Sequence, residues 1–318
     1  MCSCIMGIVS DISKGKRSKG GKGNMTLLSC KIIYMVAEQA SFLKAAALLN
    51  LTPSAVSHAV KTAEKEVGFQ IFNRNKNGVS LTSYGEQLFP YIVSLLNSEE
   101  SLNQFIDKLN GLDQGTVRIG AFNSVCIEWL PELLSEFRKR YPAIAVEVFE
   151  GTYDDVIGWL NTGVIELGFL SASCNTTYSI TPLYEDRLVC IAPEGFQTKK
   201  KGYITLEEMQ QHPFVIQRES CDADIQKFLS DKKLDIHRSC HVIDDQAIAA
   251  MVASGFGISI MPELTSRSLG GSLEVLEIEE ASMRLIGLAM PEKPGLSPAA
   301  DQLRKLILEK YQFVGAEK

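Results

Sequence analysis

Apolar residues recur with the spacing of a helix face over three short stretches near the start of the chain. These stretches run from Leu27 to Gln39, from Ser41 to about Leu49 and from Pro53 to about Val67, and Thr52 is a favourable N-cap for the third. Pro53 at the first helical position loses no hydrogen bond, because that N–H has no partner within a helix. The third stretch confines its apolar residues to one stripe and leaves small polar and basic residues opposite. This arrangement predicts a helix-turn-helix whose last helix can enter the major groove of DNA.

The pattern changes after the third helix. Residues Phe69 to Leu81 include a turn at Asn75 to Gly78 and predict a two-stranded wing. A single long helix is then predicted over residues 83–110, with Ser83 and Glu86 forming a capping box. Its apolar positions Leu88, Ile92, Leu95, Leu102, Ile106 and Leu109 have heptad spacing, by steps of four and three, and Glu99 is the one polar interruption of the series. The spacing alone is compatible with the surface helix of one domain and with the pairing of two chains.

Beyond Gly111, short apolar strands alternate with helical stretches, which predicts an α/β body. We expect one lobe at about 115–185 and 268–318 and a second at about 186–267, whose first strand covers Leu188 to Ala192. A cleft between two such lobes suits a small ligand, because ligands bind at the carboxyl ends of strands and at helix N-termini. The predicted fold class is α+β multidomain: a head at 25–82, a linker helix at 83–110 and a two-lobed body at 115–318.

Charge is unevenly distributed and adds a functional hint. Residues 1–110 hold 12 Lys or Arg against 8 Asp or Glu, whereas residues 111–318 hold 20 against 30. A basic head on an acidic body favours a polyanion as the partner of the head. No apolar run reaches the roughly 18 residues that a membrane helix needs, so we expect no membrane partner. The eight cysteines form no CxxC pair, which favours reduced thiols in the cytoplasm.

The segment before the first helix has a different character. Residues 1–24 combine a few apolar residues with a Lys/Gly/Ser run and hold too little apolar surface to fold, so we expect a disordered basic leader. Met25 is an alternative start of the protein. A functional interpretation is that the leader is a basic arm that touches DNA phosphates.

A set of residues in the head matches, in order and spacing, the amino-terminal signature of LysR-type transcriptional regulators: Ser41-Phe42, Ala45-Ala46, Leu49, Thr52 to Ser57, Glu64, Gly68, Ile71-Phe72, Arg74, Leu81-Thr82 and Gly85. The chain resembles this family, which implies a winged helix-turn-helix. The resemblance implies DNA contacts from Thr52, Ser54, Ser57, His58 and Lys61, and a grip on the DNA backbone by Arg74 of the wing. His58 is a departure, because many members carry Arg there and a neutral imidazole cannot make the bidentate contact of Arg with guanine.

The same resemblance gives the linker helix a role. In the family this helix is the dimer contact, so we expect a homodimer or homotetramer and an operator with an inverted repeat. The simpler alternative is that the head is only a small packed bundle whose serines are solvated surface residues.

The body resembles the effector domain of the same family, whose fold is similar to that of periplasmic solute-binding proteins. The matching residues are Ile119-Gly120 through Ser124 to Leu130-Pro131, Arg140 to Pro142, Gly163, Glu166 where Asp is usual, and Val252 to Pro262. The resemblance implies a small-molecule effector in the cleft, held by Ser124, Thr152, Ser171, Ser220 and Asp244. Acidic residues gather near this mouth in the sequence, which favours an effector with a cationic or hydrogen-donating group: Glu219, Asp222, Asp224, Asp244 and Asp245.

Enzyme chemistry finds little support in the chain. It has no GxSxG, P-loop or HExxH motif, and its four histidines offer no acid/base dyad. His237, Cys240 and His241 lie close together but lack a clear fourth ligand, so we expect no metal and no other cofactor. Cys221 stands at about the position of the reactive cysteine of peroxide-sensing members of the family, but Cys240 lies too far along the chain for the expected resolving partner.

These observations predict a cytoplasmic LysR-type DNA-binding transcriptional regulator that is not an enzyme and whose grip on DNA responds to the effector. The alternative is a solute-binding or enzymatic α/β protein whose helical head binds a partner protein.

Overall fold

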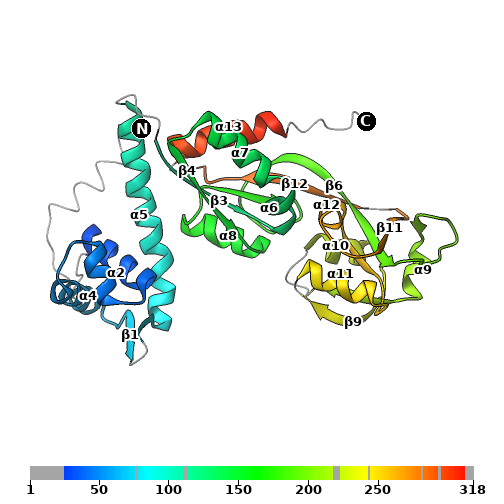
Figure 1. Cartoon of the computed structure of the whole chain (residues 1–318), viewed down its shortest axis with the longest axis horizontal. Helices are drawn as coiled ribbons and strands as arrows, with labels where there is room; N and C mark the ends of the chain where they lie inside the picture. The colour runs from blue at the N-terminus through cyan, green and yellow to red at the C-terminus, as the bar shows by residue number, and fades with distance from the viewer. Residues whose placement is uncertain are drawn as a thin grey trace. The chain divides into compact units, whose positions relative to one another are not determined.

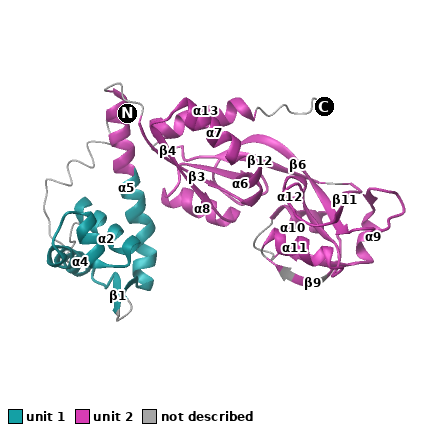
Figure 2. Ribbon diagram, viewed as in Figure 1, with its two compact units in different colours: residues 1–97 teal, residues 98–318 magenta. Residues whose placement is uncertain are grey.

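The structure is a computed structural model that forms two compact units, residues 1–97 and 98–318 (Figure 2). It describes residues 25–75, 78–109, 114–217, 223–242, 244–280, 282–292 and 295–311. The basic leader expected at residues 1–24 lies outside the described residues, as do Ser220 and Cys221.

The head consists of three helices and a short two-stranded sheet. Helices α2 (Leu27–Gln39), α3 (Phe42–Leu48) and α4 (Pro53–Val67) begin at the caps Thr26, Ser41 and Thr52, each of which accepts a backbone N–H through its side-chain oxygen. Strands β1 (Phe72–Asn75) and β2 (Gly78–Leu81) pair antiparallel and form the wing. The helix bounds and the wing agree with those predicted from the hydrophobic pattern and the caps.

Glu64 of α4 holds the start of the wing against the helix. Its Oε1 accepts the backbone N–H groups of Ile71 (2.9 Å) and Phe72 (3.2 Å), so a carboxylate of the helix satisfies the first donors of the wing. Gly68 ends α4 with φ of 86°, a left-handed conformation that glycine adopts without strain. Gly85 lies directly against the backbone of Ile71, so any side chain at this position would clash with the Ile71 carbonyl oxygen.

Helix α5 (Ser83–Leu109) differs from the prediction in two respects. Its cap is Thr82, whose Oγ1 accepts the backbone N–H of Gly85 at 3.0 Å, and Ser83 is already helical, so the predicted capping box of Ser83 and Glu86 is wrong. The heptad positions also divide: Leu88 and Ile92 pack into the core of the head, whereas the later positions Leu95, Leu102, Ile106 and Leu109 are exposed. The first part of the stripe therefore serves the fold of the head itself.

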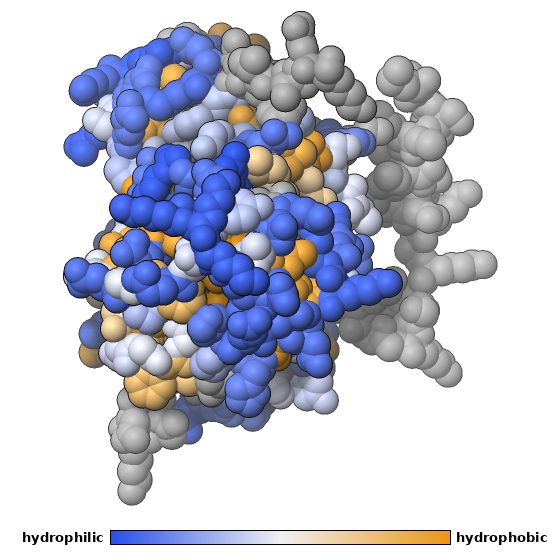
Figure 3. Space-filling model, turned by 90° about the vertical axis from the view of Figure 1, so that its right-hand side faces the viewer, coloured by the Kyte–Doolittle hydropathy of each residue, from blue (hydrophilic) through white to orange (hydrophobic). Residues whose placement is uncertain are grey.

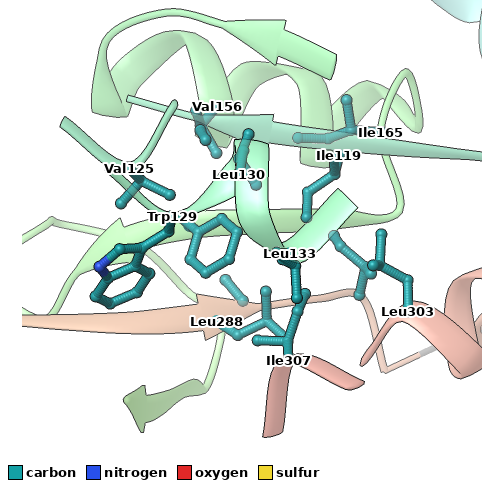
Figure 4. Packing of buried hydrophobic residues seen from close by; sticks show 14 of the residues in the cluster. Ile119, Val125, Trp129, Leu130, Leu133, Val156, Ile165, Leu288, Leu303 and Ile307 are labelled. Carbon is teal, nitrogen blue, oxygen red and sulfur yellow. The ribbon is translucent and has the colours of Figure 1, made fainter. Parts of the chain in front are cut away.

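The first lobe of the body is built on a twisted sheet. Strands β3 (Gly115–Ala121), β4 (Ile144–Glu150) and β5 (Leu167–Ser171) are parallel, and β12 (Met283–Ala289) returns antiparallel beside β5. Helices α7 (Leu130–Arg140) and α13 (Pro298–Lys310) cover one face, and α8 (Tyr153–Thr162) covers the other (Figure 1). Figure 4 shows Leu133 of α7, Leu288 of β12 and Ile307 of α13 meeting in the core of this lobe.

Strand β6 (Ile180–Pro193) joins the two lobes, since it pairs with β12 over its first half and with β10 (Ser259–Pro262) and β11 (Leu273–Ile278) over its second. Only Leu188 to Ala192 was predicted, because the polar residues before them obscure the strand pattern. Strand β11 belongs to the second lobe, so the chain returns to the first lobe after Ile278 and not near residue 268 as predicted.

The remainder of the second lobe surrounds this half of β6. Strand β7 (Tyr203–Ile204) pairs in parallel with β11, while β8 (Pro213–Gln217) and β9 (His237–Val242) form a separate parallel pair. The helices are α9 (Leu206–Gln210), α10 (Ala223–Asp231), α11 (Asp245–Ala253) and the short α12 (Glu263–Ser266). On the face that Figure 3 shows, hydrophilic residues predominate and hydrophobic ones form small separate patches. None of the described helices combines the length and apolar character needed to cross a membrane.

Candidate nucleic-acid interface and effector cleft

The polar face of α4 is open to solvent. Val56, Val60 and Ala63 are buried against α2 and α3, which turns the opposite side of the helix outward. On that outward side the predicted contact residues Thr52, Ser54, His58 and Lys61 are exposed, and Ser57 is half-buried. Near the start of the helix, the hydroxyl oxygens of Thr52 and Ser54 lie 3.0 Å apart. The structure therefore presents hydroxyl, imidazole and ammonium groups together along one helix.

Arg74 of the wing joins this surface. Its Nη1 donates to Ser57 Oγ at 3.3 Å, and its guanidinium carbon lies 4.3 Å from the centroid of the Phe42 ring. The ring and the hydroxyl hold the planar cation beside α4, although strand β1 and the helix are separate elements. Phe42 was noted in the sequence only as part of the family signature, and its support of Arg74 depends on the packing of α3 against the wing.

A cavity of about 320 Å³ lies between the two lobes of the body. Three residues that were predicted to contact an effector line it: Ser124 of α6 (Asn123–Glu128), Thr152 at the cap of α8 and Asp244 at the cap of α11. Ser171 does not line it: this side chain is fully buried and donates to Asp224 Oδ1 at 2.7 Å. Ser220 lies outside the described residues. Three of the five predicted effector contacts thus line one cavity.

The most buried charge in the cavity wall is Arg284, which no sequence signal indicated. Its side chain is 3% exposed, and its Nη2 lies 2.5 Å from Asp186 Oδ2, which is 1% exposed. Arg284 also donates to Ser124 Oγ at 3.0 Å and to the Tyr153 hydroxyl at 3.3 Å, and it lies over the ring of Phe122. Burial raises the pKa of the Asp186 carboxyl, and the charge of Arg284 acts in the opposite direction.

Four carboxylates also line the described wall of the cavity. Asp244 Oδ1 caps α11 by accepting the Ala247 N–H at 2.8 Å, and Asp245 Oδ1 accepts from the Gln217 side-chain amide at 2.6 Å. Burial raises the pKa of Asp245, and the neighbouring charge of Asp244 raises it further. Glu150 and Asp155 also line the cavity. Among the described lining residues, four carboxylates therefore accompany one cation, Arg284, whose charge is already matched by Asp186.

The sequence also raised a redox cysteine and a metal site near His237, Cys240 and His241. Cys221, the candidate redox residue, lies outside the described residues. Cys240 is half-buried on β9, and within the described part of the chain no group of three or more His, Cys, Asp or Glu side chains is placed to hold a metal ion.

Comparisons with known proteins match both parts of the chain. Residues 28–86 match the family described as "Bacterial regulatory helix-turn-helix protein, lysR family", and residues 110–312 match the "LysR substrate binding domain". The HTH-type transcriptional regulator YvbU of Bacillus subtilis, itself uncharacterised, is 28% identical over 297 residues, which cover 92% of this chain and 100% of YvbU. The HTH-type transcriptional activator CmpR of Synechocystis sp. is 28% identical over 262 residues, covering 80% of this chain and 86% of CmpR.

Solved structures of transcriptional regulators share this fold. Full-length CbnR in complex with its target DNA superposes with a TM-score of 0.66 at 16% identity, over 89% of this chain and 99% of CbnR. The winged helix-turn-helix, the long helix and the two-lobed body therefore occur together in known regulators. On the two family matches and this shared architecture, the chain belongs to the LysR family of transcriptional regulators.

Proposed function

We propose that this regulator binds duplex DNA through α4 and the wing, and that a small molecule in the cleft changes how the regulator holds that DNA. The observation that carries the DNA proposal is the outward face of α4, where four of the five predicted contact residues are exposed and Arg74 is held beside the half-buried Ser57. The complex of CbnR with its target DNA supports the same use of the head.

The side chains of this surface differ in whether they suit base edges or phosphate groups. Hydroxyls and an imidazole at Thr52, Ser54, Ser57 and His58 suit the donors and acceptors of base edges in the major groove. Lys61 and Arg74 suit phosphate oxygens, and contacts of that kind position the protein without reading sequence.

The exposed part of α5 supports pairing of two chains. Leu95, Leu102, Ile106 and Leu109 keep heptad spacing while about half or more of each residue is open to solvent. A second copy of the same helix would bury this stripe, which favours a homodimer or an assembly of such dimers. Two copies of α4 related by a twofold axis would meet an operator with inverted half-sites.

The cleft is the proposed effector site. A cavity of about 320 Å³ falls at the lower end of the range for small-ligand sites, and the apolar side chains of Phe122 and Ile248 line it beside its polar groups. Ser124, Thr152 and Asp244 are the proposed contacts. The excess of carboxylates in the described wall favours an effector with a cationic or hydrogen-donating group. Because the partner of the head is genomic DNA, the proposed location is the cytoplasm.

A salt titration of DNA binding by the full-length protein tests the proposal. Fragments recovered from genomic DNA by pull-down would serve as labelled duplexes in fluorescence anisotropy. Phosphate contacts predict a steep fall in affinity with salt, because each neutralised phosphate releases counterions. Lys61→Ala should weaken binding to every duplex, whereas the matched control Lys139→Ala, exposed on α7, should bind as the wild type does. Absence of duplex binding at low salt would favour the alternative in which the helical head binds a protein.

A further inference from the structure

We infer that Asp224 is the centre of an interlobe latch, formed with Ser171, Ser173 and Tyr153, that couples the contents of the cleft to the closure of the two lobes. The inference rests on the proposed effector function of the cleft and concerns how that site is regulated. It also gives Ser171 a role other than the effector contact predicted from the sequence.

The latch joins side chains of opposite lobes. Asp224 lies in the first turn of α10 in the second lobe and is 7% exposed. Its Oδ1 accepts the hydroxyl groups of Ser171 and Ser173, each at 2.7 Å, and its Oδ2 accepts the Tyr153 hydroxyl at 3.1 Å. Ser171 ends β5 and Tyr153 begins α8, both in the first lobe. Both carboxylate oxygens are therefore engaged by hydroxyl donors of the opposite lobe.

The hydrogen bonds to Asp224 stabilise the closed arrangement of the lobes, and water can replace them when the lobes separate. Hydrogen bonds to an ionised carboxylate are stronger than those between neutral groups, and the low dielectric of a buried site strengthens them further. When the lobes separate, water can hydrate Asp224 and the three hydroxyl groups, which offsets most of the lost contact. The balance between the two arrangements is thus small enough for a bound ligand to shift it.

Tyr153 connects the latch with the cavity. Its ring lines the cavity, and its hydroxyl accepts from Arg284 Nη1 at 3.3 Å while donating to Asp224. Arg284 in turn donates to Ser124, a proposed effector contact. Ile225, adjacent to Asp224 on α10, also lines the cavity. A ligand that moves Tyr153 therefore changes the donors available to Asp224, and one that moves Arg284 changes the donor to the Tyr153 hydroxyl.

Hydrogen–deuterium exchange of the full-length protein without ligand tests the latch. Asp224→Asn should raise amide exchange in residues 153–162 and 223–231 by roughly tenfold, since it replaces an acceptor by a donor amide facing hydroxyl groups. Exchange in β3, inside the core of the first lobe, should stay unchanged. Asp231→Asn, on the same helix with an exposed side chain, is the matched control and should leave both segments as in the wild type. Unchanged exchange in Asp224→Asn would overturn the latch.

Two milder variants keep the test decisive if Asp224→Asn fails to fold, because each removes one hydroxyl. Tyr153→Phe and Ser173→Ala should both loosen residues 223–231, but only Tyr153→Phe should also raise exchange in residues 123–128 around Ser124. Equal effects of the two variants on that segment would refute the connection through Tyr153. DNA affinity of the same variants, measured separately, reports on the proposed function: a wild type that binds no duplex would refute that function, while the exchange data would still decide on the latch.

Discussion

Arg284→Met is the perturbation for which the structure makes the sharpest quantitative prediction. Methionine keeps much of the length of the side chain but removes the guanidinium, leaving the Asp186 carboxylate without its ion pair at 1% exposure. Asp186 keeps the backbone N–H of Leu264, which it accepts at 3.0 Å. Breaking one side of a buried ion pair costs about 3–5 kcal/mol, because the remaining charge stays buried. We expect a loss of this size in the free energy of unfolding of the body.

The pH dependence of this loss follows from the direction of the Asp186 pKa. Burial raises that pKa in the folded protein, and removing Arg284 takes away the main charge that opposes the rise. A carboxyl with a raised folded pKa takes up protons more readily in the folded state than in the unfolded state, so its contribution to stability improves as pH falls. The deficit of Arg284→Met should therefore be largest near neutral pH and shrink as the pH falls into the acid range.

Urea unfolding followed by tryptophan fluorescence measures this effect in the body alone, because both tryptophans, Trp129 and Trp159, lie in the first lobe. The matched control is Arg267→Met, which breaks an exposed pair with Glu263 and should cost under about 0.5 kcal/mol. Replacing both members of the buried pair, Asp186→Leu with Arg284→Met, should restore most of the lost stability. If Arg284→Met costs no more than Arg267→Met, or if its deficit is independent of pH, the reasoning is wrong.

Three further predictions concern the head and the linker helix. Glu64→Ala should destabilise the head by roughly 1–3 kcal/mol because two backbone donors lose their acceptor, seen as faster amide exchange over residues 27–67; unchanged exchange would contradict this. Ile106→Glu should shift the protein towards monomer in sedimentation velocity, whereas Asn103→Glu, also exposed on α5, should not; identical profiles would exclude the stripe as the contact. Ser57→Ala should reduce the preference for operator over random DNA by roughly three- to tenfold, while Lys61→Ala should weaken both alike; equal losses on both duplexes for each variant would refute this division.

The elements of the head could be predicted because their signals are local. A helix start needs only a capping oxygen and the next few N–H groups, so Ser41 and Thr52 place α3 and α4 from sequence alone. The stripe of buried residues on α4 has the helical period, which also determines the face on which the predicted DNA-contact residues lie. The spacing of α5 was equally clear, but it could not show that Leu88 and Ile92 pack into the head while Ile106 remains exposed.

The predicted residues that line the candidate cleft all lie at the start of a helix, and Ser124 is in the first turn of α6. Thr152 and Asp244 are caps, and the helix N-termini they mark do line the cavity. Ser171 has the same polar character at the end of a strand, yet the approach of α10 buries it against Asp224. The sequence pattern alone had no means of distinguishing these two outcomes.

Periodicity and caps, read along the chain, predicted the elements of the head and most of the order of helices and strands, and the residue signature between Ser41 and Gly85 indicated the family by resemblance. The tertiary structure decided which polar residues meet: Arg284 with Asp186, and Asp224 with hydroxyl groups of the other lobe. The physical reason is that a cap or an apolar stripe is satisfied within a few residues, whereas a buried charge is satisfied by a partner that the fold brings from a distant part of the chain.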